Sequence, residues 1–283
     1  MHPVLFKLGP LEIRAYGLML AIAFLLGIWL SVQRAKKKNV DPNQIMDVSV
    51  LIIISAIVGS RLLYVLFHLE EFRGHWLDTI NPLQSNGQIG IAGLTMLGGV
   101  ILSFITVLIY LRVKKLPFLV FADIILPLFA LGEAITRLGC YLNGCCFGLP
   151  CEHGGFCVTF PPDSPAGAMF GAVPLYPTQL YQSFYGLLMF GLMLLAEKKF
   201  RYTGFQLHLF FILYGIGRFT IDFFRYYEES MIIGSIAGKA ISLNQGISLV
   251  FILLGIGLIL WNHRKSSGTK AAPAWSGRAR ESK

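Results

Sequence analysis

The chain has 283 residues, of which 55% are hydrophobic and 14% charged, and its formal net charge is +9. This composition is too apolar for an ordinary soluble domain. Apolar runs of roughly 20 residues recur along the sequence, which is the length that an α-helix needs to cross a bilayer. We therefore predict an all-α fold, a polytopic membrane bundle of about seven transmembrane helices.

The predicted helices follow one another from near the N-terminus to a basic C-terminal segment. A soluble all-α protein would need charged helix faces, and these runs carry few charged residues. The first run precedes its cluster of basic residues, which indicates an uncleaved span rather than a signal peptide. The seven predicted spans are residues 16–32, 46–67, 91–111, 118–138, 178–196, 205–223 and 243–261.

Lysine and arginine residues cluster after every second predicted span. The clusters follow the first, third, fifth and seventh spans, whereas the connection 139–177 contains neither residue type. Because basic residues are retained on the cytoplasmic side, the N-terminus is predicted outside and the C-terminus in the cytoplasm. The positive net charge is attributed to this topology and not to nucleic-acid binding. A multi-pass protein of the bacterial plasma (inner) membrane fits the arrangement.

The predicted spans form one transmembrane domain, residues 1–265, without an internal repeat. The segment 266–283 is rich in Ser, Gly, Ala, Arg and Lys, and is predicted to be a disordered basic tail in the cytoplasm. Two outer connections are long. One is 68–90, which contains Trp76, and the other is 139–177, which contains every cysteine of the chain.

The cysteines are predicted to face the oxidising side of the membrane, where one or two disulfides are expected. Their number is odd, so at least one thiol stays free or pairs outside this group of cysteines. Their spacing lacks the paired C-x-x-C pattern of zinc sites, and His153 is the nearest histidine. Structural disulfides, packed free thiols, and metal or redox chemistry are the alternatives, and no metal ligand or cofactor is predicted. The cysteines are Cys140, Cys145, Cys146, Cys151 and Cys157.

Charged residues inside the predicted spans are costly at membrane depth and are usually functional. Glu133 and Arg137, and likewise Arg218 and Asp222, are spaced to pair on one helix. Structural ion pairs between helices are the alternative explanation. The other such charges are Arg61, Asp123 and Arg225.

The arginines outnumber their acidic neighbours, which indicates a bound anion. A helix bundle should not bury surplus positive charge without one. The planar guanidinium suits phosphate, which it can grip with two parallel hydrogen bonds. An anionic phospholipid head group at the outer leaflet is the natural candidate, because Arg137 and Arg218 lie near the predicted outer ends of their helices.

Glycines are concentrated at the start of the third predicted span and around the end of the fourth. Gly98 and Gly99 belong to the first group, and Gly139 and Gly144 to the second. Small residues allow either a lipid or a neighbouring helix to approach the backbone closely. The sequence leaves both interpretations open, lipid contact and helix packing.

Two longer motifs contain the buried arginines. Residues 137–144 read Arg-Leu-Gly-Cys-Tyr-Leu-Asn-Gly, and residues 214–225 read Tyr-Gly-Ile-Gly-Arg-Phe-Thr-Ile-Asp-Phe-Phe-Arg. With shorter motifs at 16–19, 59–64, 177–181 and 242–245, they resemble the prolipoprotein diacylglyceryl transferase family of bacteria. The resemblance covers most of the chain outside the C-terminal tail.

The resemblance implies transfer of diacylglyceryl from phosphatidylglycerol to the lipobox cysteine thiol of a prolipoprotein, with release of glycerol phosphate and without a cofactor. Arg137 falls on the family's head-group-binding arginine, Arg218 on its essential arginine, and Asp222 on its acidic position. The predicted catalytic residues are Arg218, Tyr16, Tyr214 and Asp222, and the predicted substrate-binding residues are Arg137, Arg61, Asn143, Gly98, Gly99, Glu133 and Gln179.

The chain departs from the family pattern at several positions, which indicates a divergent, cysteine-rich branch. Leu97 stands where the family has a histidine, which is its candidate base, and leucine cannot accept a proton. Cys140 and Cys145 replace an asparagine and an acidic residue of the signature, and Tyr176 and Gln182 replace a histidine and a glutamate.

These departures keep two other functions open. One is a related membrane enzyme that uses another acceptor or thiol redox chemistry, and the other is a non-catalytic lipid-binding or transport protein. A thiol near neutral pH is already a few per cent thiolate, so a dedicated base is dispensable. Glu133, Tyr16 and Tyr214 are the candidate proton acceptors.

Overall fold

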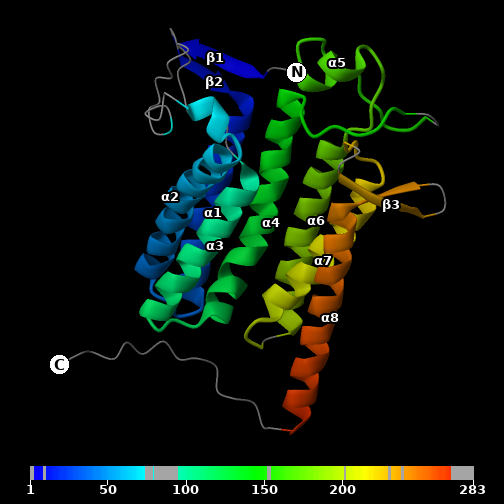
Figure 1. Ribbon diagram of the computed structural model, residues 1–283. Helices are drawn as coiled ribbons and strands as arrows, with labels where there is room; N and C mark the ends of the chain where they lie inside the picture. Colours follow the sequence, from blue (N-terminus) through cyan, green and yellow to red (C-terminus); the bar gives the residue numbers. More distant parts are fainter. Residues whose placement is uncertain are drawn as a thin grey trace. The chain divides into compact units, whose positions relative to one another are not determined.

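The computed structural model describes residues 3–8, 11–73, 79, 95–151, 154–200, 202–228, 231–236 and 239–268, and its regular structure is mostly helical (Figure 1). The helices are α1 (Ala15–Lys37), α2 (Pro42–Phe67), α3 (Met96–Val113), α4 (Phe118–Asn143), α5 (Pro165–Phe170), α6 (Thr178–Lys199), α7 (Phe205–Asp222) and α8 (Leu243–Gly268), with a 3-10 helix, η1 (Leu69–Phe72). Two short hairpins accompany them, β1 (Val4–Leu8) with β2 (Leu11–Arg14), and β3 (Ile232–Ile236) with β4 (Lys239–Ser242).

Six of the described helices are long and apolar enough to cross a membrane, namely α1, α2, α3, α4, α6 and α8. They confirm the predicted helical, multi-pass membrane protein. The remaining long helix, α7, is not among the six, and it carries Gln206, His208, Arg218 and Asp222. The count of seven spans therefore stays a prediction.

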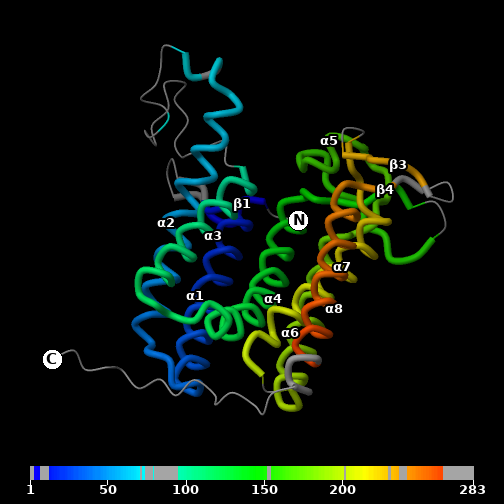
Figure 2. The backbone as a smooth tube through the Cα atoms, turned by 60° about the horizontal axis from the view of Figure 1, so that its bottom comes forward, coloured from blue at the N-terminus to red at the C-terminus, as the bar shows by residue number. Residues whose placement is uncertain are grey.

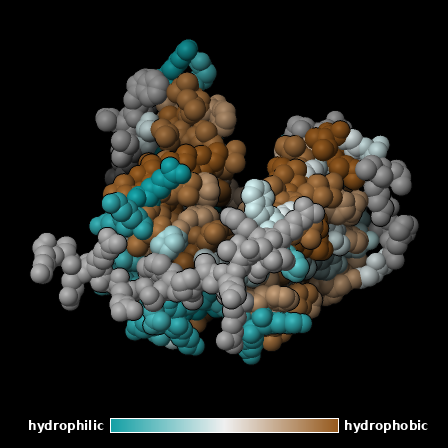
Figure 3. All heavy atoms as spheres, turned by 90° about the horizontal axis from the view of Figure 1, so that it is seen from below, coloured by the Kyte–Doolittle hydropathy of each residue, from teal (hydrophilic) through white to brown (hydrophobic). Residues whose placement is uncertain are grey.

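Large apolar side chains are abundant on the surface of the long helices. Leu25 on α1, Leu66 on α2 and Leu253 on α8 are 70%, 59% and 69% exposed. In Figure 3, hydrophobic residues cover much of the visible face, and hydrophilic residues gather in separate patches. Exposed leucine on this scale is expected where lipid, rather than water, is the solvent.

The chain divides into two compact units. The smaller is Leu8–Leu11 with Val32–Phe118, and there α2 packs against α3. The backbones meet at Gly59 and Gly98, where a Cβ atom on Gly98 would lie 2.2 Å from the Gly59 carbonyl oxygen. Gly99 likewise lies against Ala56. Close packing of two helices therefore accounts for both glycines of the predicted substrate site.

The larger unit comprises Met1–Lys7, Glu12–Ser31 and Leu119–Lys283. Within it α7 packs against both α6 and α8, and Figures 1 and 2 show these three helices side by side. The buried centre of the unit contains Ala130, Met189, Met193 and Phe210.

The acidic residue near the start of α4 has a structural role. Asp123 is buried, and its carboxylate accepts hydrogen bonds from the backbone N–H groups of Gly204, at 2.7 Å, and Gln206, at 2.9 Å. These groups begin α7, where unpaired N–H groups and the helix dipole favour a negative charge. Asp123 therefore fixes the start of the helix that carries Arg218.

Some sequence predictions concern parts of the chain outside the described residues. They include Trp76, His153 and the predicted tail 266–283, of which only the last residues of α8 are described. The third predicted span, 91–111, corresponds to α3 from Met96 onward.

Candidate functional site

Arg218 lies in the last part of α7 and is held on two sides. Its Nε is 3.4 Å from the Oδ1 of Asp222, which confirms the predicted pairing, and its Nη2 donates a 2.7 Å hydrogen bond to the hydroxyl of Tyr227. Nη1 of Arg218 is buried and has no hydrogen-bond partner among the described residues. The guanidinium is thus fixed in place with one donor edge still open.

The partners of Arg218 are themselves fixed by the start of α8. The hydroxyl of Ser242 donates to the Oδ2 of Asp222 at 3.3 Å, and the side chain of Asn244 donates to the hydroxyl of Tyr227 at 3.1 Å. Asp222 is buried, so its negative charge offsets the positive charge of Arg218 locally. This network, and not a single ion pair, orients the guanidinium.

A narrow pocket opens in front of Arg218 between α4, α6 and α7. Both side-chain amide atoms of Gln182 are buried there without a hydrogen-bond partner in the described part of the chain. Because buried polar groups are normally paired, this amide, which lines the same pocket as Arg218, indicates a site for a polar ligand. The pocket is lined by Glu133, Gln182, Tyr185, Gly186, Met189, Tyr214, Gly217, Arg218 and Ile221.

The second predicted ion pair lies on α4 beside this pocket. Oε1 of Glu133 is 3.6 Å from Nη2 of Arg137, and both side chains are mostly buried. Glu133 lines the pocket together with Tyr214, whose ring stacks on Phe210 with the centroids 5.3 Å apart. The structure therefore brings the predicted residues Arg218, Tyr214 and Glu133 to one pocket.

Arg225 follows α7 in a segment that pairs with the connection after α4. Gly148 and Arg225 form an antiparallel bridge, and the backbone N–H of Leu149 donates to the carbonyl of Phe224 at 2.9 Å. The guanidinium of Arg225 lies 5.4 Å from the ring centroid of Tyr227. This pairing holds the positive charge of Arg225 close to the cysteine-rich connection.

One disulfide joins Cys151 and Cys157, in line with the one or two expected from the sequence. The thiols of Cys140, Cys145 and Cys146 are free. Hydrogen bonds from Cys140 and Cys145, followed by the positive charges of Arg225 and Arg137, lower the pKa of the Cys146 thiol. A lowered pKa favours a thiolate at this position.

Three further predicted residues surround these cysteines rather than the pocket. The side-chain amide of Gln179 donates a 2.8 Å hydrogen bond to the carbonyl of Cys145, and Asn143 forms a side-chain hydrogen bond with the same residue. Tyr16 on α1 lies near enough to Cys140 and Arg137 to interact with them electrostatically. Gln179 is fully buried. Its hydrogen bond therefore holds the loop that contains Cys145 in position.

Arg61 lies in the other unit, on α2. Its Nε donates a 3.0 Å hydrogen bond to the carbonyl of Thr79, and its guanidinium lies 5.1 Å from the ring centroid of Phe72. Leu97, at the start of α3, is 60% exposed. These contacts give Arg61 local partners within its own unit.

Gln182 and Tyr227 are among the residues of the pocket and its network that the sequence did not predict as site residues. Gln182 was noted only as a departure from the family pattern, although it follows Gln179 by three positions and so lies on a similar face of α6. Tyr227 carries no charge and lies beyond the end of α7, so no helical spacing connects it with Arg218.

Comparison with known proteins gives one consistent family. A family model described as prolipoprotein diacylglyceryl transferase matches residues 3–261. The chain is 34% identical over 267 residues to phosphatidylglycerol–prolipoprotein diacylglyceryl transferase 1 of Clostridium perfringens, covering 92% of this chain and 94% of the relative. Proteins with the corresponding name in Clostridium tetani and Thermosynechococcus vestitus are 31% and 33% identical, covering 90% and 88% of this chain and 96% and 88% of the relatives.

Proposed function

The chain belongs to the prolipoprotein diacylglyceryl transferase family, and on this premise we propose that it transfers a diacylglyceryl group from phosphatidylglycerol to the lipobox cysteine of a prolipoprotein. The observation that carries the proposal is the pocket in front of Arg218. There a fixed guanidinium has an open donor, Nη1, beside the unpaired amide of Gln182. Both groups suit the phosphate and hydroxyls of an anionic head group.

In the proposed reaction, the thiolate sulfur of the acceptor attacks the glyceryl carbon that carries the phosphate ester. A carbon–sulfur bond forms while the carbon–oxygen bond breaks, and glycerol phosphate leaves with the electron pair. Negative charge grows on the leaving phosphate, so a guanidinium already held in place stabilises the transition state more than the ground state. Arg218 has this role, and Arg137, paired with Glu133, lies beside the pocket.

The acceptor thiol must lose its proton before or during the attack. Glu133 and Tyr214 line the pocket, whereas Tyr16 lies nearer the cysteines, so the first two are the proton acceptors closest to the proposed phosphate position. Of these, Glu133 offers a carboxylate, a side chain that commonly serves as a general base. We assign the proton to Glu133, with Asp222 retained as the group that orients Arg218.

We extend the proposal to the topology. Counting α7 as a span gives seven, so the two termini lie on opposite sides of the membrane. We infer that the N-terminus is outside and the C-terminus in the cytoplasm of a bacterial inner membrane. Basic residues in the last turns of α1, α3 and α6 support this orientation. Residues 1–265 would then form the transferase domain, with 266–283 as a cytoplasmic tail.

The function is tested in cells depleted of their own transferase, with a lipobox reporter whose mobility changes on lipidation. The wild-type chain is expected to restore the shift, and Arg218→Ala is expected to abolish it at equal membrane abundance. Arg73→Ala is the matched control, because Arg73 pairs with Glu70 on an exposed surface. A wild-type chain that is present in the membrane without lipidating the reporter would refute the proposed function.

A further inference from the structure

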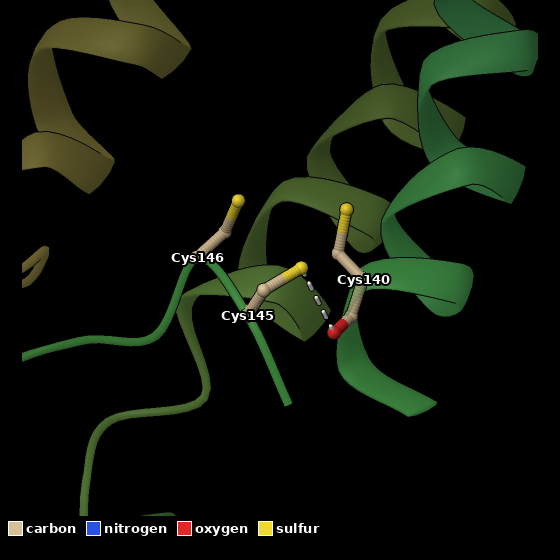
Figure 4. A group of neighbouring side chains, drawn as sticks. All are labelled: Cys140, Cys145 and Cys146. Atoms are coloured by element: carbon tan, nitrogen blue, oxygen red, sulfur yellow. Dashed lines mark hydrogen bonds between the residues drawn. The ribbon is translucent and has the colours of Figure 1, made fainter. Parts of the chain in front are cut away.

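Three thiols that the proposed reaction does not use lie together beside the end of α4. Cys140 is in the last turn of that helix, and Cys145 and Cys146 follow the turn at Gly144. Their three sulfur atoms all lie within 4.8 Å of one another, and Figure 4 shows them gathered in the same space. Cys140 is buried, and the other two are half-buried.

The turn between these cysteines depends on glycine. Gly144 has a φ of 71°, and a Cβ atom there would lie 2.6 Å from the Cβ of Ser164. The turn returns the chain onto the end of α4, where the N–H of Cys145 donates to the carbonyl of Cys140 at 3.1 Å. Cys146 also has a positive φ, 60°, a conformation that is costly for a residue with a side chain.

Two buried side chains at the start of α6 hold the loop in this conformation. The hydroxyl of Thr178 donates to the carbonyl of Cys146 at 2.9 Å, and the amide of Gln179 donates to the carbonyl of Cys145 at 2.8 Å. Thr178 and Gln179 are both fully buried. The positions of the sulfur atoms are therefore fixed by the fold, in the absence of a disulfide among the three.

The spacing of the sulfur atoms suits one metal ion. A bond between a thiolate sulfur and a d10 metal is about 2.3 Å long, so three sulfur atoms arranged trigonally around the ion are about 4 Å apart. Sulfur atoms already within 4.8 Å reach that arrangement by small side-chain rotations. A disulfide would use two of these thiols and leave the third unpaired, whereas metal binding uses all three.

Two arginines lie close enough to the cysteines to offset the charge of a bound metal–thiolate cluster. Three thiolates around a monovalent or divalent cation leave a net negative charge, which must be offset where water is largely excluded. Arg225 and Arg137 both interact with Cys146. Arg137 has Glu133 as its partner, but Nη1 of Arg225 is buried and unpaired in the described part of the structure.

We propose that Cys140, Cys145 and Cys146 form a binding site for one soft d10 metal ion, of the Cu(I) or Zn(II) class. Thiolate sulfur selects such ions over hard cations such as Mg²⁺ or Ca²⁺. Each thiol that binds loses its proton to solvent, so binding releases up to three protons and changes no oxidation state. The proposal goes beyond lipid transfer and does not depend on it.

The test uses the purified full chain in detergent. The protein is loaded anaerobically with Cu(I) or Zn(II), passed over a desalting column with a competing chelator, and its metal content is measured by mass spectrometry. One equivalent is expected in the wild type, and at least a tenfold weaker affinity in Cys140→Ser, Cys145→Ser and Cys146→Ser. The control is the double variant Cys151→Ser/Cys157→Ser, which is expected to bind as the wild type does. Retention of only one of the two ions would support the site and identify its metal.

A second measurement on the unaltered protein covers variants that fail to fold. Bound metal is expected to slow alkylation of the three thiols by iodoacetamide at least tenfold, read by peptide mass spectrometry. The proposal is overturned if the folded wild type retains neither ion, if the serine variants retain as much as the control, or if two of the three cysteines are recovered as a disulfide. Metal retention is measured without any transfer assay, so its result tests the metal site independently of the proposed function.

Discussion

Replacing Tyr227 with phenylalanine tests whether Arg218 must be held in a fixed orientation. The substitution removes one oxygen atom, which accepts hydrogen bonds from Nη2 of Arg218 at 2.7 Å and from Asn244 at 3.1 Å. A hydrogen bond to a charged group is worth about 1.5–3 kcal/mol. If that energy orients the guanidinium toward the leaving phosphate, its loss slows transfer about 10- to 100-fold, since about 1.4 kcal/mol corresponds to a factor of ten.

The assay is the initial rate of transfer from labelled phosphatidylglycerol to a lipobox peptide in vesicles, at equal amounts of folded enzyme. Tyr226→Phe is the matched control. Its ring packs against Phe147 and Phe170, and its hydroxyl has no hydrogen bond among the described residues. A rate for Tyr227→Phe within a factor of two of this control would refute the idea that the Tyr227 hydroxyl positions Arg218.

Three other substitutions test the pocket and the helices that build it. Gln182→Leu is expected to slow transfer at least fivefold. Thermal stability is expected to stay unchanged or to rise, because the substitution removes a buried amide without a partner among the described residues. A lower unfolding temperature, measured in detergent, would contradict this. Asp123→Ala removes the two hydrogen bonds that begin α7 and is expected to destabilise the protein by about 1–2 kcal/mol, measured by thermal unfolding; an unchanged unfolding temperature would exclude the capping role. Gly98→Ala is expected to lower the unfolding temperature, because the added Cβ atom would clash with Gly59. Gly27→Ala is the neutral control, since there is open space at its Cβ position. Equal effects of the two substitutions would argue against close packing of α2 on α3.

The sequence predicted the features that depend on local pattern. Long apolar runs gave the helices, because a span must satisfy its backbone hydrogen bonds internally and therefore takes one regular form. Four-residue spacing gave the pairs Glu133 with Arg137 and Arg218 with Asp222, because such residues are neighbours on a helix. Both predictions use distances along one element, and both are confirmed.

Contacts between distant segments were beyond the same reasoning. Asp123 accepts a hydrogen bond from Gly204, 81 residues later in the chain, and Gly98 packs against Gly59 on another helix. Neither contact can be inferred from local spacing. The three free cysteines are similar, since C-x4-C-C matches no paired metal motif. Their sulfur atoms come together only because Gly144 turns the chain and Gln179 holds it from another helix.

Of the arginines that first indicated an anion, Arg61 lies in the smaller unit, and the others are divided between two places in the larger unit. Arg218 and Arg137 each have an acidic partner, so the net charge of each ion pair is small. Their proposed contribution to phosphate binding is therefore a correctly oriented hydrogen-bond donor, the Nη1 of Arg218. For Arg225 no ion pair is found among the described residues, and its charge acts on Cys146. The proposed head-group recognition therefore depends on the orientation of a neutralised pair, whereas the charge of Arg225 lies beside the cysteines. An anion is still required there, and three thiolates around a metal ion would provide it.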